Sequence, residues 1–330
     1  MKKNSSSAGP MAVGGQAVIE GVMMRAPGRV STAVRRSDGS ITVRTEEQRS
    51  LAERFPILKL PVFRGAVGLV EMMVIGIRTL NYSAEVSLQE VGEAEKNGKR
   101  DEPPGTSRNL KLGLTVGFAL LAGIALFFAL PLFLASAFLS VGQDPLWFNV
   151  ATGAIRVGLL LGYLAVISMM QDIRRLFEYH GAEHKAVFAF EFGQPLEVSA
   201  AVTQSRFHPR CGTSFLLIVM LSSILLFSLL DTLMILWLGH LTLPIRLMTH
   251  LPLIPLVGGL SYEVIRLSAR YSRSLIGRII VAPGLWLQRI TTREPDAGQL
   301  EVALAALRAA LGRTEEAGTP NPVGLEYTTS

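Results

Sequence analysis

The chain has 330 residues, of which 49% are hydrophobic and 18% are charged, a composition too apolar and too poor in charge for an average soluble domain. Its formal net charge is +6, but the basic residues border apolar runs and form no continuous block. We therefore expect anionic lipid headgroups as partners, and we do not expect nucleic acid. The single cysteine, Cys211, excludes a framework of internal disulfides and favours a reducing cytoplasm around the polar parts.

The N-terminal region, residues 1–54, is expected to be cytoplasmic and to contain a β-hairpin. Its start carries two lysines but no apolar stretch follows them, which argues against a cleaved signal peptide. Farther on, GGQAVIEGVMMR leads into STAVRRSDGSITVRTEE, where Asp38 and Gly39 lie between alternating β-forming residues. An Asp-Gly pair in this setting is typical of a tight hairpin turn.

Residues 55–84 are expected to form an amphipathic helix that lies in the membrane interface. The segment is apolar, but Arg64, Glu71 and Arg78 are spaced seven residues apart and therefore lie on one helical face. Residues 85–111 are charged and contain Pro and Gly, so they are expected to form a linker.

Residues 112–290 are expected to form the transmembrane domain of a mainly α-helical, multi-pass membrane protein with about four transmembrane helices. A helix needs about 20 apolar residues to cross the hydrocarbon core. The candidates are Leu112–Leu139, Val150–Met170, Phe215–Gly239 and Ile245–Leu267. Pro252 and Pro255 interrupt the fourth candidate, which is therefore expected to be kinked or partly unwound.

The distribution of positive charge predicts the orientation. The segment between the first two helices has no Lys or Arg, whereas the loop at residues 171–213 has five. The positive-inside rule then places this loop and both termini on the cytoplasmic side of the cytoplasmic (inner) membrane. Residues 291–330 are expected to form a C-terminal amphipathic helix, capped by Asp296, and a tail.

The cytoplasmic loop contains EYHGAEHK, which holds two of the five histidines of the chain. His180 and His184 are four residues apart, so on a helix both imidazoles lie on one face and could bind one metal ion. Glu183 could act as the catalytic base that takes a proton from a metal-bound water. The order H-x-x-E-H is the pattern of inverzincin metalloproteases, which favours zinc. Two alternatives stay open: a polar helix face without metal, and Glu183 as a ligand or as a residue that orients a histidine.

Two further segments could complete a zinc site at the cytoplasmic membrane face. HPRCGTSF places His208 and Cys211 three residues apart just before the third membrane helix, and imidazole and thiolate both bind zinc. Cys211 could equally be a small, buried apolar residue. SYEVIR supplies Glu263 as a further ligand at the end of the fourth helix, where a carboxylate is costly unless it is paired or functional.

The chain resembles the YqhQ family of bacterial membrane proteins, a family of unknown function often labelled as predicted metal-dependent enzymes. The resemblance runs through GGQAVIEGVMMR, Arg64-Gly65, EYHGAEHK, HPRCGTSF, SYEVIR and PGLWLQRITTREP, and it covers nearly the whole chain apart from both tails and the linker. It implies a multi-pass membrane protein with a metal bound through the His, Glu and Cys motifs. It implies no particular substrate.

These observations predict a membrane-embedded, metal-dependent hydrolase with a divalent metal, zinc by preference, and a peptide or lipid-linked substrate. The alternative is a non-enzymatic membrane scaffold or assembly factor, in which the metal has a structural role and only links the central loop to the helix ends. Metal-ion transport is a third hypothesis, for which Arg156, Asp231 and Glu263 are the candidate polar groups in the membrane.

Overall fold

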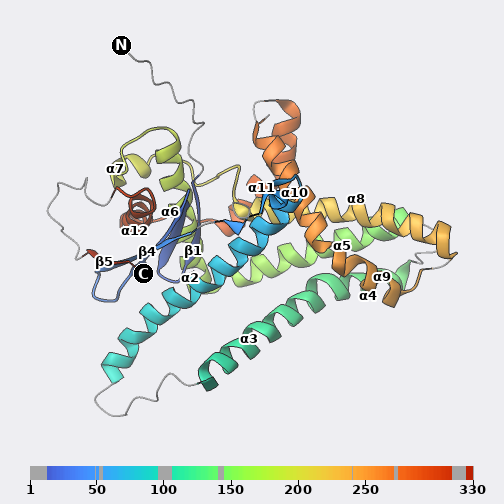
Figure 1. Ribbon diagram of the computed structural model, residues 1–330, viewed down its shortest axis with the longest axis horizontal. Coiled ribbons are helices and arrows are strands. Elements are labelled where there is room, and N and C mark those ends of the chain that lie inside the picture. The colour runs from blue at the N-terminus through green and yellow to red at the C-terminus, as the bar shows by residue number, and fades with distance from the viewer. Residues whose placement is uncertain are drawn as a thin grey trace.

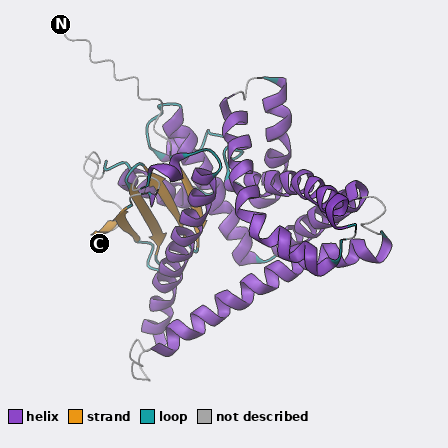
Figure 2. Ribbon diagram, turned by 45° about the vertical axis from the view of Figure 1, so that its right-hand side comes forward, coloured by secondary structure: helices purple, strands orange, loops and turns teal. Residues whose placement is uncertain are grey.

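The structure, a computed structural model, describes residues 13–48, 50–51, 55–95, 106–139, 145–239, 241–270, 274–313 and 325–329. It is mainly helical, with a β-sheet at one end and a group of long helices that extends away from it (Figures 1 and 2). Residues 1–12 of the N-terminal region, residues 96–105 of the expected linker and residues 314–324 of the tail lie outside the described residues.

The sheet is an antiparallel meander of four strands with a fifth, parallel strand at its edge. The strands are β1 (Gly14–Val18), β2 (Gly21–Ala26), β3 (Arg29–Arg35), β4 (Ile41–Glu47) and β5 (Leu325–Thr329), in that spatial order. The hairpin expected at Asp38-Gly39 is confirmed as β3–β4, and Gly39 has a φ of 88° in its turn. The sheet is larger than one hairpin because GGQAVIEGVMMR forms another, β1–β2, in which Glu20 takes a φ of 52°.

Two helices pack on one face of this sheet and form the main hydrophobic core with it, while Ile75 of the helix at residues 63–95 packs against Met23 and Val30 on the other face. The two core helices are α6 (Gln171–Glu191) and α12 (Ala297–Ala310), and the short α7 (Val198–Ala201) contacts both. Alanines dominate the buried faces of α6 and α12, which lets the helices approach the strands closely. Asp296 caps α12 as expected and forms a capping box with Gln299. The segment that carries both candidate histidines is therefore a core helix.

In the part of the chain that the structure describes, three helices are long and apolar enough to cross a membrane: Gly113–Phe138, Leu146–Ile167 and Phe215–Leu238. The first consists of α3 (Thr106–Ile124), a π-helical turn η2 (Ala125–Ala129) and α4 (Leu130–Phe138), and the others lie in α5 (Pro145–Ile167) and α8 (Gly212–Leu238). They correspond to the first three predicted spans.

The fourth predicted span is broken into pieces. It contains α9 (Leu243–His250), a 3-10 turn η3 (Leu251–Leu253) and α10 (Ile254–Arg270). Pro252 lies in the turn, where its ring and its missing N–H interrupt the helix. Among the described residues three spans are supported, and the fourth is not confirmed.

A long helix, α2 (Phe63–Glu95), follows the short turn η1 (Pro56–Lys59) and continues into the segment expected to be a linker. Two of its charged residues face the protein, since Arg64 pairs with Glu263 of α10 and Glu71 is buried. Apolar side chains on the other side are exposed: Leu69, Val70, Met73, Val74, Ile77 and Leu80. After α10, helix α11 (Leu275–Thr291) brings the chain back toward α6, which positions the site.

Candidate metal centre

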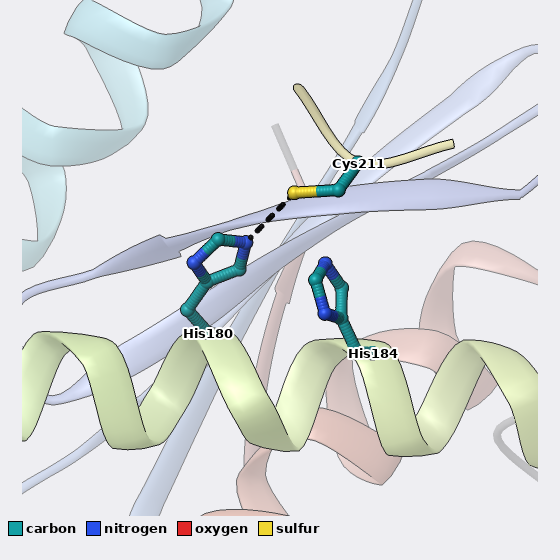
Figure 3. Close-up of side chains that lie close together, drawn as sticks. All are labelled: His180, His184 and Cys211. Carbon is teal, nitrogen blue, oxygen red and sulfur yellow. Dashed lines mark hydrogen bonds between the residues drawn. The ribbon is translucent and has the colours of Figure 1, made fainter. Parts of the chain in front are cut away.

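His180 and His184 lie one turn apart on α6, with their ring centroids 4.5 Å from each other (Figure 3). The helix has Asp172 in its first turn, where a negative charge is favourable, and Gly193 follows its end with a φ of 64°. Because α6 packs against the sheet and α12, His184 is buried and His180 is half-buried, so neither imidazole lies on a fully solvated helix face.

Gly181, between the two histidines, allows a second segment to cross α6 at this point. A Cβ atom at Gly181 would overlap the carbonyl oxygen of Arg293, and the N–H of Arg293 donates to the carbonyl of Phe177 at 2.8 Å. The chain that leaves α11 is thereby held against α6. Its Thr291 carbonyl comes within reach of His180.

Both imidazoles donate a hydrogen bond from Nδ1 to a backbone carbonyl. His180 Nδ1 lies 2.8 Å from the oxygen of Thr291, and His184 Nδ1 lies 2.5 Å from the oxygen of Arg206. A carbonyl oxygen can only accept, so in the neutral imidazoles Nδ1 carries the hydrogen and Nε2 carries the lone pair. This is the outer arrangement that metal-binding histidines usually have.

Cys211 approaches the same place from the start of α8 (Figure 3). It is the N-cap of that helix, where its Sγ accepts from the N–H of Thr213 and lies 3.2 Å from Nε2 of His180. A cysteine binds zinc through its sulfur, as the thiolate. One ligand atom from each of His180, His184 and Cys211 lies within 4.8 Å of the others. Bonds of about 2.0–2.3 Å to one zinc ion imply a separation of about 3.5 Å, so the side chains would move closer together when the ion binds.

Nε2 of His184 is the polar atom that most clearly fits a metal. It is buried and meets no partner in hydrogen-bond geometry, although Oε2 of Glu183 lies 3.4 Å away, the thiol of Cys211 is a neighbour, and the ring is fixed by the bond at Nδ1. A buried acceptor without a partner is costly unless something else satisfies it. A metal ion bound by Nε2 would do so, and the donor set of two imidazoles and one thiolate suits zinc.

The electrostatics of the site keep its imidazoles neutral. Burial lowers the pKa of His180, of His184 and of His208, because a charged imidazolium would lose its hydration there. The Glu183 charge partly opposes this effect at His180 and His208. The neutral form is the one that binds a metal ion.

Glu183 places its carboxylate beside the metal-binding atom of His184. Its Oε2 lies 3.4 Å from His184 Nε2, and its side chain is buried. Burial raises the pKa of the carboxyl group, against the effect of the nearby histidines and of a hydrogen bond from the N–H of Gly15. A Cβ atom at Gly15 would stand 2.8 Å from Cγ of Glu183, so the strand β1 touches Glu183 only because residue 15 is glycine. A buried carboxyl with a raised pKa is suited to take up a proton.

His208 lies next to the three candidate ligands but outside their group. Its ring centroid is 5.6 Å from that of His184, while its Nε2 is 3.4 Å from Glu191 and its Nδ1 accepts from the N–H of Arg210. The described structure thus turns both nitrogens of His208 toward other partners.

Glu263 is engaged elsewhere. Both its oxygens bind the guanidinium of Arg64, at 2.7 Å to Nε and 2.6 Å to Nη2, and it is not part of the group formed by His180, His184 and Cys211. The pair joins α10 to α2. In this arrangement Glu263 has a structural partner and no metal-binding neighbour among the described residues.

Comparison with known proteins places the chain in a family. Residues 60–313 match the family described as Protein of unknown function (DUF1385). The chain belongs to this family. It is also 35% identical to the "Uncharacterized protein YqhQ" of Bacillus subtilis (strain 168) over 309 residues, which cover 92% of this chain and 93% of the relative, so the resemblance to YqhQ is confirmed. No solved structure matches the chain.

The sequence analysis did not identify the residues that form hydrogen bonds with the histidines and fix their orientation. All of these residues lie in the part of the chain that matches DUF1385. Thr291 and Arg206 act through backbone carbonyls, which leave no signature in residue type. Gln288 binds both the N–H and the carbonyl of His208, at 2.8 and 2.7 Å. The one available signal was that PGLWLQRITTREP is among the stretches on which the resemblance to the YqhQ family is based.

Proposed function

We propose that the protein is a multi-pass protein of the cytoplasmic membrane that binds one zinc ion at the cytoplasmic face and hydrolyses a peptide or lipid-linked substrate there. His180, His184 and Cys211 would hold the ion. The observation that carries the proposal is the buried Nε2 of His184, which has no hydrogen-bond partner and lies beside Cys211 and His180. Both histidines are held in the metal-binding tautomer.

The ligand set supports a catalytic site. Three protein ligands leave one position open, as in catalytic zinc sites, where the metal lowers the pKa of a bound water towards neutrality. Glu183 would act as the general base, because its carboxylate lies 3.4 Å from the metal-binding nitrogen of His184. His208 would stay outside the ligand set and contribute polarity.

The membrane placement supports a substrate that arrives from the bilayer or from the cytoplasm. Cys211 caps the start of α8, so the site lies at the end of the candidate membrane spans and next to the sheet. The exposed apolar face of α2 would lie in the interface, with anionic lipid headgroups around the basic residues. Both termini would then be cytoplasmic, following the positive-inside rule.

One observation favours the alternative of a scaffold with a structural metal. The site joins α6, the segment at Arg206 to Cys211 and the end of α11, so a bound ion would tie three parts of the chain together. In that case zinc stabilises the fold and Glu183 has no chemical task.

Elemental analysis of the full-length protein in lipid nanodiscs tests metal binding first. We expect about one zinc ion in the wild type and a large loss in His184→Ala. A metal content near zero in the wild type, after growth with zinc, would remove the basis of the proposal.

Glu183→Gln separates the two functions, with Glu178→Gln on the same helix as the matched control. In the hydrolase, Glu183→Gln keeps its zinc and its melting temperature but no longer rescues a deletion strain, and a substrate accumulates in lipid or peptide extracts. In the scaffold, both variants rescue fully. Full rescue by Glu183→Gln would therefore eliminate the catalytic role.

A further inference from the structure

An arginine lies at the midpoint of the second candidate membrane span. Of the 23 residues of α5, eleven precede Arg156 and eleven follow it, and its side chain is buried. Each end of the helix is about 16 Å away, at 1.5 Å per residue. This is farther than an arginine side chain extends, so the guanidinium does not reach the membrane surface by snorkelling.

Every hydrogen-bond partner of Arg156 in the described part of the chain is uncharged. Nε donates to the carbonyl of Phe127 at 2.9 Å, and Nη1 donates to Oγ of Ser223 at 3.2 Å. The guanidinium carbon also lies 5.3 Å from the centroid of the Phe128 ring. Among the described residues Nη2 makes no hydrogen bond, so this nitrogen is left for another partner.

The buried carboxylate in the same group of helices interacts with other residues. Asp231 pairs with Arg246, lies 3.0 Å from Nε2 of His250, and accepts from Nδ2 of Asn149 at 2.6 Å. Asp231 is therefore engaged by Arg246, and Arg156 has no carboxylate partner within the described residues. An uncompensated charge inside a membrane bundle is costly, and residues of this kind mark functional sites.

The π-helical turn η2 holds the guanidinium in place. Phe127 lies in the middle of η2, and π-helical turns are frequent at functional sites. The Phe127 ring packs edge-on against Tyr163 of α5, with the centroids 5.6 Å apart. The guanidinium is therefore oriented by two neutral acceptors and bordered by aromatic rings.

We propose that Arg156 binds a phosphate oxyanion inside the membrane bundle through its free Nη2. Arginine keeps its charge at every physiological pH, and its hydrogen bonds to phosphate are charge-assisted. The rings of Phe127, Phe128 and Tyr163 provide apolar surface of the kind that an acyl chain contacts. Because Arg156 lies far from both ends of α5, the phosphate of an anionic phospholipid would reach it only if the headgroup entered the bundle, whereas free phosphate would enter as an ion, and the test separates these sources.

This site is separate from the candidate metal centre. Ser223 follows Cys211 by twelve residues along α8, which is about 18 Å of helix. The inference stands whether the metal centre is catalytic or structural.

The test compares wild type, Arg156→Gln and Arg174→Gln, the last being an exposed arginine of α6 that serves as a control. Native mass spectrometry of protein from mixed phosphatidylglycerol and phosphatidylcholine nanodiscs counts the retained phosphatidylglycerol. Thermal melting in a neutral detergent, with phosphate against chloride at equal ionic strength, tests free phosphate. We expect Arg156→Gln to bind one of these probes about tenfold more weakly than wild type and Arg174→Gln to bind it equally.

Retention of phosphatidylglycerol that depends on Arg156 identifies a lipid phosphate, and a melting shift by phosphate that depends on Arg156 identifies free phosphate. Equal responses of wild type and Arg156→Gln to both probes would overturn the site. If Arg156→Gln does not fold, the wild type is tested alone, and the absence of both a preference for phosphatidylglycerol and a melting shift by phosphate would overturn the site. If the wild type responds to one of the probes, Ser223→Ala replaces Arg156→Gln in the comparison, because it removes the hydroxyl group that Nη1 of Arg156 binds.

Discussion

Gly181 lies in direct contact with the carbonyl group of Arg293, at the point where the chain leaving α11 crosses α6. This contact brings the carbonyl of Thr291 to Nδ1 of His180, 111 residues away in the sequence. The conformation of His180 therefore depends on a residue that has no metal-binding atom of its own.

Gly181→Ala should weaken zinc binding without changing any ligand. The added Cβ atom would displace the segment around Arg293 and break the Thr291–His180 bond, which should lower zinc affinity about 10- to 100-fold and the free energy of unfolding by about 1–3 kcal/mol. Competition with a zinc chelator measures the affinity. Gly68→Ala in α2 is the matched control, because open space surrounds Gly68. Equal zinc affinity in both variants would contradict the role of this contact.

Glu263→Gln should leave the zinc content unchanged. Its carboxylate binds Arg64 and lies outside the group of candidate ligands, so the variant should only loosen α10 from α2. Cys211→Ser in the same experiment should lose most of its zinc, because a serine hydroxyl is a poor zinc ligand. Elemental analysis measures the zinc content of both variants. A loss of zinc in Glu263→Gln would show that Glu263 is a zinc ligand after all.

Acid should destabilise the metal-free protein. Burial lowers the pKa of His180, His184 and His208, so below the ordinary histidine pKa of about 6.5 the unfolded chain binds protons that the folded chain does not. The free energy of unfolding should therefore fall as the pH drops through this value and stay level above it.

Glu183 works in the opposite direction, because burial raises its pKa and the folded state takes up its proton first. Melting of chelator-treated Glu183→Gln between about pH 5 and pH 8 isolates the histidines. A melting temperature that rises on acidification would contradict the expected sign.

Asp231→Asn should strongly destabilise the helix bundle. Asp231 is fully buried and pairs with Arg246, so the variant leaves a buried guanidinium without its counter-charge. We expect a loss of about 3–5 kcal/mol, visible as a lower melting temperature in detergent. Asp172→Asn on the exposed start of α6 removes only a charge at a helix start and should cost less than about 1 kcal/mol. A small effect of Asp231→Asn would mean that water or another group already compensates Arg246.

The sequence by itself determined the features that depend on short-range pattern. Long apolar runs predicted four spans, of which three are supported among the described residues. The spacing of His180 and His184 placed both on one face of a helix, and Asp38-Gly39 and Asp296 indicated a turn and a cap. These features follow from the period of a helix or from the chemistry of a single turn, so a few neighbouring residues are enough to specify them.

Only the tertiary structure decided which distant residues meet. It brought Cys211 to His180, sent Glu263 to Arg64, and turned the nitrogens of His208 toward Glu191 and the N–H of Arg210. The physical reason is that these contacts depend on how α6, α8, α10 and α11 pack. Packing places backbone carbonyls and close glycine contacts, which have no pattern along the chain.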